Sequence, residues 1–163
     1  MEIERKFLLK MLPEDLESYP HAELEQGYLA SRGTTVRIRR TDDTYCLTIK
    51  RKPEERELAD SKQAIVNVEI EETIDADLYE RLSKHLMSPM LRKTRYRIPH
   101  LSYIIELDIY HGVLTGLATA EIEFPSIEEA GLSELPDWFG EEVTNDRRYR
   151  NSFLAELTSL DEL

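Results

Sequence analysis

Alternation of apolar and polar residues is the strongest pattern along this chain. Successive side chains of a β-strand point to opposite faces of a sheet, so alternation with a period of two predicts strands. The alternating segments lie at residues 2–9, 24–30, 35–41, 44–51, 65–72, 91–98, 102–111 and 117–125. This spacing predicts a mainly β (α+β) fold of eight strands with a few helices in the connections.

Helical patterns are fewer and shorter. Residues 75–87 carry three leucines four positions apart, and Asp75 stands where an N-cap is expected. A second helix is predicted at residues 126–131, where Ser126 is followed three positions later by Glu129 in a capping-box pattern. The other expected connections are a helix at 151–160, a turn or short helix at 13–18, and a charged loop at 51–63.

Seven of the eight predicted strands carry charged residues on one face and apolar residues on the other. Asp, Glu and Lys are depleted in strands, so their accumulation on one face needs a physical reason. Within each strand nearly all of these charges have the same sign. The acids are Glu2, Glu4, Glu69, Glu71, Glu106, Asp108, Glu121 and Glu123, and the bases are Lys6, Arg37, Arg39, Lys50, Lys93, Arg95 and Arg97.

A closed barrel explains these charges better than an open sheet does. In an open antiparallel sheet the polar face is the face exposed to water, which is the alternative explanation for any single strand. Like charges two residues apart repel, and a barrel with its charged faces inside places opposite charges across from them. The interior of an eight-stranded barrel holds about one small ligand, and so many charges cannot be buried dry. We therefore predict an eight-stranded antiparallel closed barrel with a wet or ligand-filled interior.

Length and composition fit one domain spanning residues 1–163. Lys and Arg number 21 against 33 Asp and Glu, and the formal net charge of −12 argues against binding to nucleic-acid polymers. A single cysteine excludes an internal disulfide framework. No apolar run approaches the roughly 18 residues of a membrane span, and the charged N-terminal segment is unlike a signal peptide. We expect a cytoplasmic protein without a membrane partner.

The two kinds of charge indicate two kinds of ligand. Arginine and lysine clustered on three strands match a polyanion, and the planar guanidinium group suits phosphate especially well. Carboxylates on separate strands match a hard divalent cation such as Mg²⁺ or Mn²⁺. Both together predict binding of a metal–polyphosphate complex. Phosphoryl transfer requires such groups, because positioning and charge stabilisation supply most of its catalysis.

The sequence also resembles a known family. Glu-x-Glu-x-Lys at the N-terminus, formed by Glu2, Glu4 and Lys6, is similar to the signature of the CYTH superfamily, the triphosphate tunnel metalloenzymes. Further blocks that resemble the family follow in its order: QGYL (26–29), VRIRR (36–40), LTIK (47–50), EIEE (69–72), KTRY (93–96), ELDIY (106–110), EIEF (121–124) and WFGEEVTNDRRYRN (138–151). The ordered set spans residues 2 to 151 and resembles the small bacterial members.

This resemblance implies an eight-stranded antiparallel tunnel that hydrolyses or cyclises triphosphates with a divalent metal. By the same resemblance, the metal carboxylates are Glu2, Glu4, Asp108, Glu121 and Glu123, with Glu106 assisting Asp108. The triphosphate-binding bases are Lys6, Arg37, Arg39, Lys50, Lys93 and Arg95. Arg150 stands where relatives often have lysine, and a guanidinium does not simply replace an ammonium.

Tyr28 is the candidate proton acceptor. A tyrosine is a weak base unless nearby cations lower its pKa. If Gln26 and Tyr28 face the interior, Lys6 can lower the pKa of Tyr28 and orient it for a proton from the attacking water. On the residues alone, a packing or phosphate-contact role is an equal alternative, and the family resemblance favours the catalytic role.

The leading hypothesis is hydrolysis of inorganic tripolyphosphate with Mg²⁺ or Mn²⁺. The alternatives are a thiamine or nucleoside triphosphatase, an adenylate cyclase of the same family, and a module that binds polyphosphate or nucleotide without turning it over. A lipocalin-like carrier of apolar ligands conflicts with the inward charges. Because apolar strand faces then point outwards and helices are few, we also expect a symmetric homodimer that covers part of them.

Overall fold

All eight strands expected from the sequence are present in the structure, a computed structural model that describes residues 2–52 and 65–163. Most of the loop expected at 51–63 lies outside the described residues. The strands are β1 (Glu2–Leu9), β2 (His21–Ala30), β3 (Thr34–Thr41), β4 (Thr44–Arg51), β5 (Ile65–Ile74), β6 (Leu91–His100), β7 (Tyr103–Tyr110) and β8 (Ala118–Glu123). Their ends differ from the predicted ends by a few residues at most.

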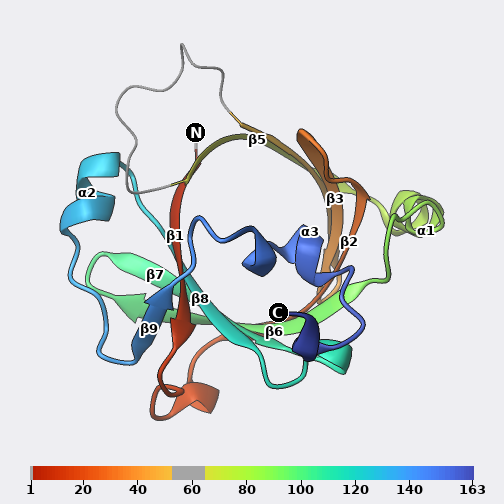
Figure 1. Cartoon of the computed structure of the whole chain (residues 1–163). Helices are drawn as coiled ribbons and strands as arrows, with labels where there is room; N and C mark the ends of the chain where they lie inside the picture. The colour runs from red at the N-terminus through yellow and green to blue at the C-terminus, as the bar shows by residue number, and fades with distance from the viewer. Residues whose placement is uncertain (1, 53–64) are drawn as a thin grey trace.

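The eight strands form a closed antiparallel barrel, as predicted (Figure 1). Neighbours follow the order β5-β4-β3-β2-β6-β7-β8-β1, and β1 pairs with β5 to close the ring. In the described part of the chain, this closing seam places Glu2 opposite Asn67, Ile3 opposite residue 66, and Glu4 opposite residue 65. The first residues of the chain therefore complete the barrel.

A ninth strand, β9 (Phe139–Glu142), was not predicted. It pairs with the later residues of β1, whose first residues pair with β5. Phe7 lies opposite Glu142, and Leu9 lies opposite Phe139. Four residues are too few to show alternation, and Gly140 permits the close approach because a Cβ there would lie 3.1 Å from the backbone oxygen of Leu8. The rings of Phe7 and Phe139 also pack 4.6 Å apart, which fixes β9 against the outside of the barrel.

The main apolar core lies outside the barrel wall. Ile105, Leu107 and Ile122 are buried there beneath α2 (Ile127–Leu132) and the segment that leads into β9. On another side of the barrel, α1 (Ala76–Ser83) packs against β3 and β4. The polar faces of the strands are thus left for the interior, as the charge pattern predicted.

The predicted N-caps are confirmed, whereas the first helix is shorter than expected. Asp75 accepts a hydrogen bond from the Leu78 backbone, and Ser126 accepts one from the Glu129 backbone. α1 ends at Ser83, so Leu86 lies beyond it and packs over Gly27, where a Cβ would come within 2.6 Å of Leu86 Cδ1. The turn or short helix expected at 13–18 is a 3-10 helix, η1 (Leu16–Ser18).

The helix predicted at 151–160 is also shorter, because its later residues fill one end of the barrel. α3 covers only Asn151–Leu154, and a separate 3-10 turn, η5 (Leu160–Glu162), begins at the capping residue Ser159. Between them, Leu157 packs with Tyr28 and Tyr110. Figure 1 shows α3 lying across the opening of the ring. No helix among the described residues is long and apolar enough to span a membrane.

Candidate functional site

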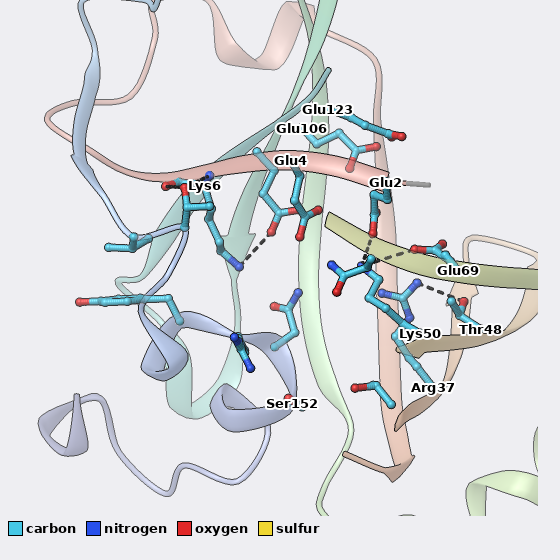
Figure 2. A pocket seen from close by; sticks show the side chains of 18 of the residues that line it. Glu2, Glu4, Lys6, Arg37, Thr48, Lys50, Glu69, Glu106, Glu123 and Ser152 are labelled. Atoms are coloured by element: carbon cyan, nitrogen blue, oxygen red, sulfur yellow. Dashed lines mark hydrogen bonds and ion pairs between the residues drawn. The ribbon is translucent and has the colours of Figure 1, made fainter. Parts of the chain in front are cut away.

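The interior of the barrel is a cavity of about 1340 Å³ lined mainly by charged and polar side chains. We call it the central cavity. Most of the predicted inward charges line it: Glu2, Glu4, Lys6, Arg37, Arg39, Lys50, Glu69, Glu71, Arg95, Arg97, Glu106, Glu121 and Glu123. Figure 2 shows several of these side chains converging from β1, β3, β4 and β5. Lys93 and Asp108, predicted for the same site, do not contribute to the lining surface.

Carboxylates from three adjacent strands form one wall of the central cavity. The strand register places Glu4 directly opposite Glu123, and Glu106 directly opposite Glu121. Like charges at directly opposed positions destabilise a sheet unless a cation lies between them. Burial, together with the negative charge of Glu121, raises the pKa of Glu4. The charges of Lys6, Arg95 and Lys93 lower the pKa of Glu121 despite its burial. Within this acidic wall (Glu4, Glu106, Glu121 and Glu123), the unfavourable negative charge is therefore concentrated at Glu4.

Glu2 lies next to this wall and is held by a lysine. Lys50 Nζ lies 2.6 Å from Glu2 Oε2 and 3.4 Å from Glu69 Oε2. Burial and the neighbouring Glu4 raise the pKa of Glu2 to about 8, although Lys50 opposes this shift. The carboxylates around Lys50 raise the pKa of its ammonium despite burial, so Lys50 stays charged.

The oxygen atoms of these carboxylates are the kind of ligand that a hard divalent cation binds. Among the described residues, no three His, Cys, Asp or Glu side chains already converge as a metal site. Two of the carboxylates contact lysines instead: Lys6 pairs with Glu121 at 2.9 Å, and Lys50 pairs with Glu2 at 2.6 Å. Within the same part of the chain, the Glu4 carboxylate has neither a hydrogen bond nor an ion pair, and carboxylate oxygens are what Mg²⁺ and Mn²⁺ prefer.

The opposite side of the central cavity is basic. Arg37 donates to Thr48 Oγ1 at 3.1 Å, and Thr48 in turn donates to Glu71 Oε2 at 3.1 Å. The guanidinium groups of Arg37 and Arg39 lie 3.7 Å and 3.5 Å from that same oxygen. The Nε atoms of both arginines are buried with no hydrogen-bond partner among the described residues. This basic wall (Arg37, Arg39 and Lys50) therefore keeps donors for an anion.

Asp108 and Lys93 form a buried ion pair behind the cavity surface. Both side chains are 1% exposed, and Lys93 Nζ lies 2.6 Å from Asp108 Oδ2. Arg95, directly opposite in the register, donates to both Asp108 oxygens at 2.7 Å and 2.8 Å. Burial lowers the pKa of Lys93 to about 8, although Asp108 opposes the shift. Asp108, one of the two predicted site residues, is thus engaged by both the other, Lys93, and Arg95.

Tyr28 lies on the inward face of β2 and is buried. Its hydroxyl oxygen accepts a hydrogen bond from Gln26 Nε2 at 2.7 Å. Burial raises the pKa of Tyr28, while the positive charges of Arg37, Lys6 and Lys50 and the Gln26 hydrogen bond act against that rise. The hydrogen bond of Lys6 goes to Glu121, so Lys6 influences Tyr28 through its charge and not through direct contact.

The C-terminal segment contributes more to the cavity than sequence reasoning expected. Arg150 lines the cavity as an exposed side chain, and it immediately precedes α3. Arg147, Asn151 and Ser152 join it, and none of these was predicted. The polar run NDRRYRNS after β9 was the available signal. Part of this run belongs to the block 138–151 that resembles the family, yet only Arg150 was predicted as a site residue, because alternation identifies strands and does not place a segment without regular structure.

A charged cavity inside an eight-stranded barrel is the architecture of a triphosphate tunnel protein. The family model for the CYTH domain matches residues 1–153, and the chain belongs to this family. A curated relative from Nitrosomonas europaea, named inorganic triphosphatase, is 36% identical over 159 residues, covering 94% of this chain and 96% of the relative. An Acetivibrio thermocellus protein of the same name is 32% identical over 158 residues, covering 95% and 93%.

Solved structures agree with this assignment. The crystal structure of the inorganic triphosphatase NE1496 superposes with a TM-score of 0.68 at 33% identity, covering 98% of this chain and 97% of that one. A Hippeastrum protein, described as a putative adenylyl cyclase with a dominant triphosphatase activity, has a TM-score of 0.62 over 80% of this chain and 83% of its own. At 18% identity, the Hippeastrum protein supports the fold alone.

Replacing Asp108 by Asn tests whether the buried carboxylate holds the barrel wall together. The change leaves Lys93 and Arg95 without their shared anion, and removing one partner of a buried ion pair costs about 3–5 kcal/mol. We expect the free energy of unfolding, measured by urea denaturation, to fall by this amount. Glu123→Gln is the control: its exposed side chain faces Glu4, so stability should change by less than about 0.5 kcal/mol. Equal stability of both variants would contradict the structural role of Asp108.

Proposed function

We propose that this protein hydrolyses inorganic tripolyphosphate inside the barrel, with Mg²⁺ or Mn²⁺, to orthophosphate and pyrophosphate. The observation that carries the proposal is the pair of oppositely charged walls facing one cavity. A chain of phosphates needs cationic side chains, whereas its metal needs carboxylates, and both are present here. The names of the two curated relatives support the same substrate.

In this proposal the bases bind the phosphates. Lys6, Lys50, Arg37 and Arg39 are the main contacts, with Arg95 and Arg150 at the cavity surface. Arg37 and Arg39 share Glu71 in the resting protein at ion-pair distances longer than an ideal bond. Two oxygens of a phosphate group can contact one guanidinium group in a bidentate manner and at shorter distances. The triphosphate therefore displaces Glu71 from the two arginines. Lys93 acts from behind the surface, by holding Asp108.

The acids would hold the divalent cation. Glu2, Glu4, Glu121 and Glu123 are the proposed ligands. Burial, together with unfavourable negative charge, raises the pKa of Glu2 and Glu4, and a bound cation would relieve that negative charge. When bound, the ion neutralises charge on the phosphate oxygens and so favours attack at phosphorus. For Asp108 we propose a supporting part, since Lys93 and Arg95 already occupy both of its oxygens.

Tyr28 is the proposed proton acceptor. Water attacks the terminal phosphorus, the bridging P–O bond breaks with its electron pair leaving on pyrophosphate, and a water proton passes to the Tyr28 oxygen. Because burial keeps the Tyr28 pKa above its usual value near 10, only a small fraction ionises at neutral pH. The positive charges of Lys6, Lys50 and Arg37 are what make that fraction available.

An organic triphosphate is the second candidate substrate. Phe153 lines the central cavity and is 39% exposed, so its ring is available to stack on a nucleobase or a thiamine ring. This observation keeps nucleoside and thiamine triphosphates, and cyclisation of ATP, as alternatives. A module that binds polyphosphate without hydrolysis does not require the carboxylates of the acidic wall.

We also propose that the protein forms a homodimer and that it is located in the cytoplasm. Ile49 and Ile70 lie directly opposite each other on the outer face of β4 and β5, and they are 37% and 57% exposed. A symmetric partner would cover these side chains. The single cysteine, Cys46, is free, which suits a reducing compartment.

Phosphate release from a substrate panel tests the proposed activity. With Mg²⁺ or Mn²⁺, we expect faster release from tripolyphosphate than from ATP or thiamine triphosphate, and none in EDTA. Faster turnover of an organic triphosphate would favour the second candidate. Binding of tripolyphosphate that persists in EDTA, with no hydrolysis of any substrate after metal is restored, would refute the proposal that this protein is a triphosphatase.

Arg37→Lys tests the basic wall and has a matched control on the same strand. Lysine keeps the charge and loses the guanidinium fork, so we expect KM for tripolyphosphate to rise about tenfold or more. Arg40→Lys changes an exposed arginine on β3 that does not line the central cavity, and KM should stay within about twofold. Equal KM values for the two variants would contradict phosphate binding at Arg37.

Tyr28→Phe tests the proton acceptor. We expect wild-type kcat to rise with pH through the alkaline range without a plateau below about pH 10, because the Tyr28 pKa is raised and only its ionised form accepts a proton. The Phe variant should lose most turnover at saturating substrate and lose this rise with pH. Unchanged kcat would rule out Tyr28 as an essential acceptor.

A further inference from the structure

Gln26 is a fully buried polar side chain that the proposed reaction does not yet use. It lies on β2 with an exposure of 0%, two residues before Tyr28 and on the same inward face. Across the sheet it faces Arg39 on β3 and Leu91 on β6. A leucine or methionine would fill this space without burying an amide. The presence of an amide here therefore needs an explanation.

The Gln26 amide makes one hydrogen bond, to the hydroxyl of Tyr28. Its Nε2 donates to Tyr28 Oη at 2.7 Å, and its Oε1 has no partner among the described residues. A buried carbonyl oxygen without a partner is unfavourable by itself. The one hydrogen bond that the amide makes is therefore the contact by which Gln26 can act on Tyr28.

The direction of this hydrogen bond decides what Tyr28 can do. Because the phenol oxygen accepts from Gln26, the phenol proton is not used in the bond and Tyr28 can lose it. The amide stays a donor after that loss, so the same contact stabilises the phenolate. Burial raises the pKa of Tyr28, whereas the positive charges of Arg37, Lys6 and Lys50 all act to lower it.

We propose that Gln26 is a positioning residue for Tyr28: its amide fixes the phenol oxygen and leaves it free to exchange a proton with the attacking water. This inference rests on the proposed function, in which Tyr28 is the acceptor. It also explains why the residue is glutamine. A glutamate of the same size would accept the phenol proton and add a negative charge, so it would hold Tyr28 in the protonated form.

A double-mutant cycle tests the proposal. Gln26→Glu and Gln26→Leu are each made in the wild-type chain and in the Tyr28→Phe chain, and kcat and KM for tripolyphosphate are measured with Mg²⁺. In the wild-type chain we expect kcat to fall about tenfold or more in both variants, with KM within about threefold. In the Tyr28→Phe chain the same changes should have almost no further effect, because Gln26 acts through Tyr28.

Two outcomes of the cycle would overturn the proposal. Equal losses of kcat in both chains would mean that Gln26 acts independently of Tyr28. A raised KM with unchanged kcat would mean that Gln26 shapes phosphate binding instead. Thermal denaturation of each variant shows whether the barrel is still folded, and Gln26→Glu serves where Gln26→Leu does not fold, because it keeps the size and polarity of the side chain.

A spectroscopic measurement tests the contact without relying on turnover. Protein labelled with ¹³C at the tyrosine Cζ atom has a Tyr28 resonance that is assigned by its absence in Tyr28→Phe. We expect both Gln26 variants to move this resonance at a fixed pH, because it reports the hydrogen bond on the phenol oxygen. An unmoved resonance would overturn the inference. If the resonance moves and the wild-type protein releases no phosphate from any substrate, the proposed function fails and the Gln26 contact stands.

Discussion

Compensation of charge inside a closed barrel is the constraint on which this structure depends. The strands turn their charged faces inward, where each charge must find a partner, a ligand or water. Ion pairs across neighbouring strands meet part of this need, as Lys6 does for Glu121 and Lys50 for Glu2. As far as the structure describes the chain, the pairing is incomplete at Glu4 and at the Nε atoms of Arg37 and Arg39, and these are the places where metal and phosphate are proposed to bind.

The inward charges also determine how the rest of the molecule is built. With polar side chains inside, the apolar strand faces point outward and need covering, so α1, α2 and the β9 region pack on the outside of the wall. The C-terminal segment is the exception. It places Leu154 and Leu157 against Tyr28 and Tyr110 at one end of the interior, so this end is apolar and the remainder of the cavity is charged. The buried position of Tyr28, which opposes its ionisation, follows from this arrangement.

Much of the fold was predictable because alternation is a local property. All eight barrel strands and the N-caps at Asp75 and Ser126 could be read from short stretches of sequence. Most residues that line the cavity could also be predicted, because alternate residues along a strand point to the same face of the sheet. The pairing of Asp108 with Lys93 and Arg95 was not, because it depends on the register between β6 and β7 and on the depth of each residue in the wall. The short strand β9 and the placement of Arg147 and Ser152 likewise arise from contacts between distant segments.

The seam between β1 and β5 links ligand occupancy to the integrity of the fold. Within the described residues three pairs close the ring there, and Glu2 and Glu4, on the β1 side, both line the cavity. Lys50 bridges the same junction by contacting Glu2 on one side and Glu69 on the other. A ligand that contacts both sides of this junction would bind only the closed barrel, and a ligand that binds only the closed form stabilises it by mass action. A ligand held across this junction would therefore stabilise the closed ring at the strand that carries the signature residues of the family.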